Sequence, residues 1–224
     1  MSALLFKLKK QAEGRLDLHL LTPDKLEGLN LPDIAKLRLG TSHSAPQVAD
    51  YFDISGDDCN HIIFEGDCSR NDHIGASMRR GQITIRGNAG NFAGANMLGG
   101  TLICQGNVGD RLADSTRRGL ILVDGDAGSY AASRMIAGTV GIYGKVGSHL
   151  GYAMKRGTIL LTQTPSLHAT IVDCGVHELG FLPLLLRSFS ALETRFKTLT
   201  PQAVHKFAGD IGVNGKSEIL IFSA

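Results

Sequence analysis

The sequence predicts an all-β fold: a right-handed parallel β-helix of about five coils, closed by a capping segment at each end. Three observations support this prediction. Glycine supplies 28 of 224 residues, well above the usual ~7%. Glycines in the middle of the chain recur with one shared period of nineteen residues. Each repeat opens with a short alternating apolar pattern, and so short a unit can bury its apolar face only against a neighbouring copy.

The periodic glycines form three columns. They are Gly81, Gly100, Gly119, Gly138 and Gly157, then Gly87, Gly106, Gly125 and Gly144, then Gly90, Gly109, Gly128 and Gly147. We expect glycine at corners, where the chain needs positive φ or passes close to the neighbouring coil. The stretch GNAGNFAGANMLGG (87–100) is therefore interpreted as the return path of one coil.

The strand patterns QITIRG, TLICQG, LILVDG and TVGIYG share the same period, and an earlier copy, HIIFEG, lies 21 residues before the first of them. Side chains alternate along a strand, so two apolar columns are expected to point inward. One column is Ile62, Ile83, Leu102, Ile121 and Val140, and the other is Phe64, Ile85, Cys104, Val123 and Ile142. A further column, Met78, Met97, Thr116, Met135 and Met154, is expected to fill the core.

Other glycine-rich or repeated structures do not fit. A left-handed hexapeptide helix needs a multiple of six, and the LxxLxL core of leucine-rich repeats is absent. The stretch GNAGNFAG does not have the G-x-G-x-x-G spacing, and the flanking strand and helix of a dinucleotide site are missing.

The flanks are expected to cap the open ends of the coils. We divide the chain into an N-terminal capping segment (1–58), the coils (59–163) and a C-terminal helix and strand cap (164–224), which together form one structural unit. The stretches GRLDLHLL and AKLRLG are strand-like, GFLPLLLRSFSALETRF is predicted to be a helix with Pro183 in its first turn, and GDIGVNGKSEILIFSA ends in a strand.

Composition narrows the function classes. A net charge of +2 argues against a dedicated nucleic-acid binder. No apolar run is long enough to span a membrane, and the lysines near the N-terminus follow a short apolar stretch, the reverse of a secretory signal, so we expect a cytoplasmic protein. Four cysteines without a CxxC pair are expected to be free thiols.

Equivalent surface positions should lie above one another in stacked coils. Asn88 over Asn107 could form an amide ladder, and Asp126 could pair with Lys145. The strand positions expected to face outward, Thr84, Ile103, Leu122 and Gly141, are apolar enough to suit a protein contact.

Pairs of basic residues recur on alternate coils. These six residues, named here the basic edge, are Arg79, Arg80, Arg117, Arg118, Lys155 and Arg156. Leu98-Gly99 and Ile136-Ala137 stand at the same positions of the coils between them. Two interpretations remain open: a solvated edge that resists strand pairing, or a track for an elongated anion or an acidic partner.

Catalytic patterns are absent: the chain has no GxSxG, no HExxH and no Cys/His metal spacing. The densest polar cluster could be drawn as a metal site, although loops of an irregular first coil are often polar. It contains Asp57, Asp58, Cys59, His61, Asp67, Cys68, Asp72 and His73.

The G-x-x-G-x(9)-G coils at 87–100, 106–119, 125–138 and 144–157 resemble the GXGXG domain that ends glutamate synthase. A free-standing version with a helix and a final GD…GK.E.L strand resembles the C subunit of formylmethanofuran dehydrogenase and of its bacterial counterpart, the formyltransferase/hydrolase complex. Gly209-Asp210, Gly215-Lys216 and Glu218-Ile219-Leu220 match that ending. The resemblance covers nearly the whole chain and favours the C-subunit family.

The resemblance implies a non-catalytic structural subunit of a hetero-oligomer. Such a complex carries formyl groups on methanofuran or methylofuran, and the bacterial form takes formyl from a tetrahydromethanopterin donor and releases formate in formaldehyde oxidation. Other subunits would hold the furan cofactor and the metal, so no cofactor, metal or catalytic residue is expected in this chain. The archaeal enzyme adds tungsten or molybdenum and iron–sulfur clusters. The modest charge content favours the bacterial form.

The furan cofactors of this family carry glutamate-rich tails, so the basic edge is a candidate for binding such a tail or an acidic neighbouring subunit. Two alternatives remain: a glutamate-synthase-type GXGXG protein, which would co-purify with an amidotransferase and a flavin enzyme, and a β-helical polysaccharide-active enzyme, which would behave as a monomer.

Overall fold

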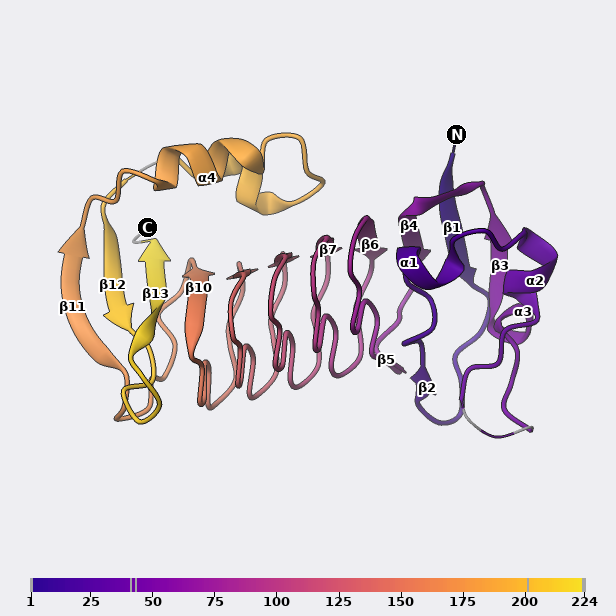
Figure 1. Ribbon diagram of the computed structural model, residues 1–224, viewed down its shortest axis with the longest axis horizontal. Coiled ribbons are helices and arrows are strands. Elements are labelled where there is room, and N and C mark those ends of the chain that lie inside the picture. Colours follow the sequence, from indigo (N-terminus) through magenta and orange to yellow (C-terminus); the bar gives the residue numbers. More distant parts are fainter. Residues whose placement is uncertain (1, 41, 43, 201, 223–224) are drawn as a thin grey trace.

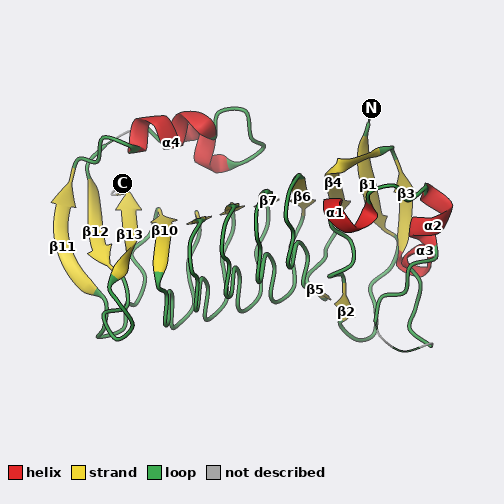
Figure 2. Ribbon diagram, viewed as in Figure 1, coloured by secondary structure: helices red, strands yellow, loops and turns green. Residues whose placement is uncertain are grey.

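Figure 1 shows the computed structural model, which describes residues 2–40, 42, 44–200 and 202–222. Within these residues, one mixed sheet of eleven strands runs along the long axis of the molecule, and a second sheet joins two short strands. The helices are short and lie in the two terminal segments (Figure 2). The expected all-β class is therefore confirmed.

The middle of the large sheet is a stack of parallel strands, each paired with the strand that follows it in the stack. From β6 onward the paired residues are nineteen apart, as in Ile83, Leu102 and Ile121. Figure 1 shows the chain leaving each strand, returning on the far side and starting the next strand alongside; we call each such turn a coil. The strands are β4 (Asp58–Glu65), β6 (Gln82–Arg86), β7 (Thr101–Cys104), β8 (Leu120–Val123), β9 (Thr139–Ile142) and β10 (Arg156–Leu161).

Both predicted inward columns are confirmed. All ten side chains are buried, and all ten belong to one core cluster that runs through the stack. The methionine column is buried as well, with Thr116 donating its hydroxyl hydrogen to the Gly94 carbonyl at 2.8 Å. The Ile62 to Ile83 pairing places the first coil 21 residues earlier, as the sequence indicates.

The return paths stack as closely as the strands. Single parallel bridges join Cys68, Ala89, Val108, Ala127 and Val146 in successive coils. Glycine is required beside them because the backbones nearly touch: a Cβ on Gly87, where φ is +151°, would collide with the carbonyl oxygen of Gly66. The corner role expected for this glycine column follows from that close approach.

The expected amide ladder exists in a different form. Asn88 accepts a hydrogen bond from the backbone NH of Asn107 at 2.9 Å, and Asn107 accepts from the backbone NH of Asp126 at 2.8 Å. Asp126 accepts from the backbone NH of Lys145 at 2.7 Å. The expected Asp126–Lys145 ion pair is not among the ion pairs of the described residues, because the carboxylate satisfies a backbone donor of the next coil instead.

The N-terminal segment extends the sheet beyond β4. Strand β1 (Ala3–Leu8) pairs in parallel with β4 and antiparallel with β3 (Phe52–Ser55). The strand expectations for GRLDLHLL and AKLRLG are largely wrong: the first contributes only the two-residue β2 (Leu16–Asp17), and the second lies at the end of a helix and forms an isolated bridge at Arg38. The remaining elements here are α1 (Pro23–Leu26), α2 (Leu31–Ala35), α3 (Val48–Tyr51) and β5 (Asn71–Asp72).

The C-terminal segment both covers the stack and extends it. Strand β13 (Lys216–Phe222) pairs in parallel with β10, and β12 (Val204–Ala208) and β11 (Val172–His177) extend the sheet in antiparallel fashion. The predicted helix is shorter than expected: α4 spans Leu182–Ser188, and the 3-10 turn η1 spans Arg195–Thr198. Pro183 lies in the first turn of α4, as predicted.

The prediction that the outer strand face is free for a protein contact is wrong. Thr84, Ile103, Leu122 and Gly141 are all buried. The chain's own C-terminal segment lies over this face and forms a second core cluster with it, which includes Leu122, Leu160, Phe189 and Phe196. Figure 1 shows α4 and its following loop lying over the row of stacked strands.

Polar contacts fasten this covering segment to the strand ends. Thr194 donates its hydroxyl hydrogen to the Asp124 carboxylate at 2.5 Å, and the backbone NH of Arg195 donates to the same oxygen at 2.9 Å. Glu193 forms an ion pair with Arg86 at 3.2 Å. No helix among the described residues is both long and apolar enough to cross a bilayer.

Candidate functional site

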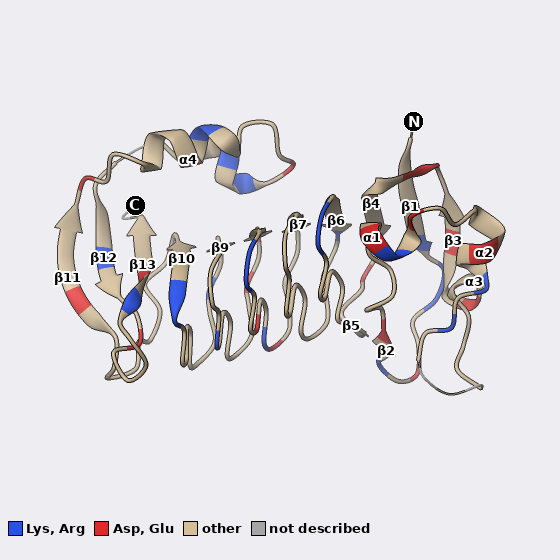
Figure 3. Ribbon diagram, in the orientation of Figure 1, with Lys and Arg blue, Asp and Glu red and all other residues tan. Residues whose placement is uncertain are grey.

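The six residues of the basic edge are brought together along one line of the stack. Each pair directly precedes a corner glycine, Gly81, Gly119 or Gly157, at the start of a strand. All six side chains are exposed. Figure 3 shows the basic segments on alternate coils beside β6, β8 and β10. Since neighbouring coils are ~4.8 Å apart, successive pairs lie about 10 Å from each other.

The first pair is already occupied by the N-terminal segment. Arg80 forms an ion pair with Glu27, and the backbone NH of Arg79 donates to the Asp24 carboxylate at 3.2 Å. Both carboxylates come from α1 and the residue after it. The chain therefore places its own acidic turn on one third of the basic edge.

The other two pairs have no comparable cover. No ion pair or side-chain hydrogen bond joins Arg117, Arg118, Lys155 or Arg156 to another of the described residues. The neighbouring Arg134 differs, because its guanidinium pairs with the buried carboxylate of Asp114. Four cationic side chains on two coils thus face solvent without a partner in the described part of this chain.

The polar cluster that could be drawn as a metal site is divided among structural contacts. Asp72 forms an ion pair with Arg15 at 2.5 Å, and His73 lies 3.2 Å from the carboxylate of Asp17. Asp57 accepts from the backbone NH of Ser2 at 2.7 Å, the largest cause of the lowered pKa of its carboxyl group. Across the described residues, no group of three or more His, Cys, Asp or Glu is arranged to hold a metal ion.

The four cysteines are free thiols, as predicted. Burial raises the pKa of Cys68 to about 11 and that of Cys104 to about 12, so both remain protonated at neutral pH. A thiolate is the form that attacks electrophiles and binds metals. These two side chains therefore suit the core and not a reactive site.

One surface column was missed by the sequence analysis. His73, Phe92, Arg111, Tyr130 and His149 follow the same nineteen-residue period, and each has φ near +60°. Their planar groups stack along the coils: His73 lies 5.0 Å from Phe92, the Arg111 guanidinium 4.9 Å from the Tyr130 ring, and Tyr130 4.6 Å from His149. The spacing was visible in the sequence, but the mixed residue types concealed it. Stacking of this kind stabilises the column.

The GD…GK.E.L ending fastens the last coil. Asp210 accepts from the backbone NH groups of Ala153 at 2.8 Å and Gly212 at 2.9 Å. Burial raises the pKa of this carboxyl group, but these hydrogen bonds, with one from Thr170, outweigh burial and lower it overall. Glu218 accepts from the Thr158 hydroxyl at 2.8 Å. The matched acidic residues thus have structural partners.

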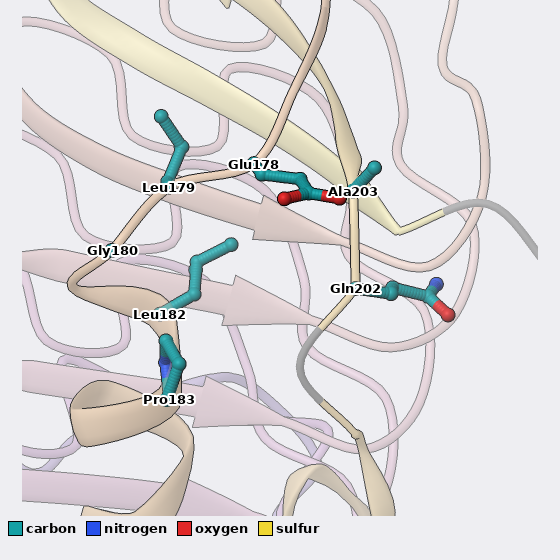
Figure 4. Close-up of a pocket in the computed structure, with 7 residues that line it drawn as sticks. All are labelled: Glu178, Leu179, Gly180, Leu182, Pro183, Gln202 and Ala203. Carbon is teal, nitrogen blue, oxygen red and sulfur yellow. The ribbon is translucent and has the colours of Figure 1, made fainter.

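The C-terminal segment contains a pocket of about 440 Å³ between α4 and the chain that enters β12. Polar and apolar atoms contribute about equally to its lining, and Glu178 is its one ionisable residue. Figure 4 shows the Glu178 side chain reaching across toward Ala203. A lone carboxylate without a neighbouring base, nucleophile or cation does not form a catalytic group.

Comparison with known proteins identifies relatives. No family model matches the chain. It is 34% identical over 84 residues to the C subunit of the formyltransferase/hydrolase complex Fhc of Methylorubrum extorquens, an alignment that covers 38% of this chain and 32% of that protein. It is 29% identical over 100 residues to the C subunit of tungsten-containing formylmethanofuran dehydrogenase 2 of Methanothermobacter wolfeii, or 42% and 37% of the two lengths. The alignments thus span about a third of these curated relatives.

The solved structures extend the likeness to the full chain. The crystal structure of the formyltransferase/hydrolase complex (FhcABCD) of Methylorubrum extorquens with methylofuran contains a chain of the same fold, with a TM-score of 0.66 and 27% identity. The match covers 97% of this chain and 98% of that one. The chain is a relative of the C subunits of these complexes. The resemblance inferred from its glycine period and its ending is confirmed.

Proposed function

We propose that this chain is the C subunit of a formyltransferase/hydrolase-type complex. In this proposal the complex passes formyl groups by way of methylofuran, or methanofuran, to formate in one-carbon metabolism. The supporting observation is the fold match over 97% of the chain to a subunit of a complex solved with methylofuran. We further propose the bacterial hydrolase type as the setting, since the relative at 34% identity and the structural match both come from a bacterial complex.

Within that complex, we propose a non-catalytic structural role. Three features support it: the stacked core, the structural partners of the acidic residues described above, and the lack of a metal-binding group among the described residues. The furan cofactor and any metal would be held by other subunits. No chemical step is therefore assigned to this chain.

The architecture that suits this role is the predicted right-handed parallel β-helix. In-register parallel strands and the second line of parallel bridges support it. We keep the proposed division into an N-terminal cap (1–58), coils (59–163) and a C-terminal cap (164–224). A rigid stack of this kind presents long, flat surfaces to neighbouring subunits.

Exposed apolar side chains also support a place in a larger assembly. Val176 on β11 is 65% exposed, Leu184 on α4 is 72% exposed, and Phe181 precedes α4. Apolar side chains gathered on one segment commonly mark protein contacts. β11 is in addition an edge strand of the large sheet, with one side unpaired among the described residues.

The test is purification of the tagged full-length chain from its host, followed by identification of the co-purifying chains and assay of formyl-methylofuran hydrolysis. We expect stoichiometric transferase and hydrolase subunits, activity in the complex, and none in the chain alone. Co-purification with an amidotransferase and a flavin enzyme would favour the glutamate-synthase-type alternative. A monomer with polysaccharide-cleaving activity would overturn the proposal.

A further inference from the structure

The way α1 lies on the first basic pair indicates how the other two pairs are used. We call this docking position a seat. Three contacts form it: the Arg80–Glu27 ion pair, the hydrogen bond from the backbone NH of Arg79 to the Asp24 carboxylate, and the packing of Pro23 over the corner glycine Gly81. A Cβ added to Gly81 would lie 2.8 Å from Pro23, so the glycine lets the acidic turn approach closely. The seat thus consists of the Arg80 guanidinium, the backbone NH of Arg79 and the glycine that follows, with the Arg79 side chain exposed beside them.

The same residue order occurs twice more. The backbone NH groups of Arg117 and Lys155 already donate to the carbonyls of Met97 and Met135, so these two seats offer a carboxylate their cationic side chains. Arg117-Arg118-Gly119 and Lys155-Arg156-Gly157 repeat the order of Arg79-Arg80-Gly81 at intervals of two coils. All three glycines have positive φ, at +78°, +115° and +104°. The three atoms nearest to a Cβ built on Gly119 or on Gly157 belong to the preceding coil, whereas at Gly81 two of the three belong to Pro23. On its other side, Gly157 is paired with Ser217 of β13.

The coils between the seats complete the pattern. Leu98 and Ile136 stand where the basic pairs would be, and both are half-buried. The line of the basic edge therefore alternates a charged pair with an apolar side chain. An acidic segment that also carries apolar residues would match this alternation.

We propose that an acidic segment of a partner protein in the complex occupies the two uncovered seats, placing its carboxylates on Arg117 and Arg118 and on Lys155 and Arg156. This inference rests on the proposed function, because it presumes that the chain is assembled with other subunits. The seats lie about 10 Å apart, which two turns of an α-helix span. Carboxylates seven residues apart on a partner helix would meet both seats.

Nucleic acid is the less fitting occupant. The net charge of the chain is only +2, whereas nucleic-acid binders are usually strongly basic. The occupied seat also shows directly that carboxylates of a folded protein segment fit there. Binding of a nucleic acid at these residues with no partner protein attached would overturn the proposal.

Lys155 provides a direct test, because a carbodiimide joins a lysine ammonium to a carboxylate only where the two are in contact. In the purified complex we expect a cross-link from Lys155 to an Asp or Glu of a partner protein. The Arg118→Lys variant should add a second cross-link to the same partner segment. Lys36, exposed and without a side-chain partner among the described residues, is the reference lysine and should show no such link.

Charge reversal supplies the second test. The variant with Arg117, Arg118, Lys155 and Arg156 changed to Glu should raise the Kd for the partner proteins at least tenfold, and the salt dependence of the Kd should shrink. The matched control changes four other exposed basic residues to Glu and should alter the Kd less than threefold. These control positions are Lys10, Lys36, Lys145 and Lys197.

The outcomes separate the two claims. If the wild-type chain does not associate with transferase and hydrolase subunits, the proposed function fails. If it associates but Lys155 forms no link and the reversed variant binds like its control, only the docking inference fails. Circular dichroism confirms that each variant is folded, and the milder Arg117→Gln/Arg118→Gln variant gives a smaller effect in the same direction if charge is the cause.

Discussion

Replacing Gly94 with alanine tests how tightly the coils interlock. Gly94 lies on a return path, where its φ is +65°. A Cβ there would lie 2.5 Å from the Cδ1 atom of Ile121 and 3.2 Å from Leu102. Ile121 is fully buried and cannot move into solvent. The equivalent position in the next coil is naturally alanine, Ala113, and the residue equivalent to Ile121 there is the smaller Val140.

The expected destabilisation has two parts. A non-glycine residue in the left-handed region costs roughly 1–2 kcal/mol, and overpacking a core typically adds about 1–3 kcal/mol. Ile121→Val alone should cost roughly 0.5–1.5 kcal/mol. Valine lacks Cδ1, so in the double variant the 2.5 Å contact disappears and the 3.2 Å contact remains. We therefore expect a favourable coupling free energy of at least ~1 kcal/mol between the two substitutions.

The assay is a double-mutant cycle of unfolding free energies from urea denaturation of the full chain. Gly28→Ala is the matched control: its φ is +78°, but a Cβ there meets nothing within 4 Å. It should show the backbone cost without the packing cost. Additivity of Gly94→Ala and Ile121→Val within ~0.5 kcal/mol, or equal effects of Gly94→Ala and Gly28→Ala, would refute the close contact.

Three further outcomes are expected. Ile121→Ala should destabilise the chain by ~2–5 kcal/mol in the same assay, because it opens a cavity in the middle of the stack, whereas Leu184→Ala, on a side chain 72% exposed, should change stability by less than ~0.5 kcal/mol. The pKa of Asp210 is lowered in the folded chain, so its carboxylate adds stability above about pH 4, the ordinary pKa of an aspartate. That stability is lost as the pH falls through the lower folded pKa. Asp210→Asn should therefore reduce the loss of unfolding free energy between about pH 5 and pH 2, measured by urea titration. Thiol titration of the folded chain at pH 7 should leave Cys68 and Cys104 unreactive, since both are buried with raised pKa values, and denaturant should expose them.

The coils could be predicted from the sequence because stacking requires the same thing at every turn. An inward position such as Ile121 has the neighbours Leu102 and Val140 directly beside it, so the same residue class recurs at a fixed interval. The period alone identifies the inward columns and the corner glycines. It also located the basic edge, whose members recur on every second coil.

The terminal segments could not be predicted in the same way, because each of their contacts occurs once. Leu122 looks like an outward strand position, and nothing periodic reveals that Phe196, far along the chain, belongs to the same buried cluster. In the N-terminal segment, the alternation in GRLDLHLL indicates a strand, but only Leu16 and Asp17 find a partner strand, at Asn71 and Asp72. In both cases the structure depends on contacts between segments that lie far apart in the sequence.

The two-coil recurrence of the basic edge is itself an argument about function. Every coil of the stack has the same backbone geometry at this corner, so the requirements of the fold predict the same residue types at each turn. The glycines obey that one-coil rule, while the basic pairs skip Leu98-Gly99 and Ile136-Ala137. Requirements of the coil therefore do not account for a period of two. A second structure whose own carboxylates repeat at about 10 Å would account for it, and α1 already shows, at Arg80 and Glu27, the contact that such a structure would make.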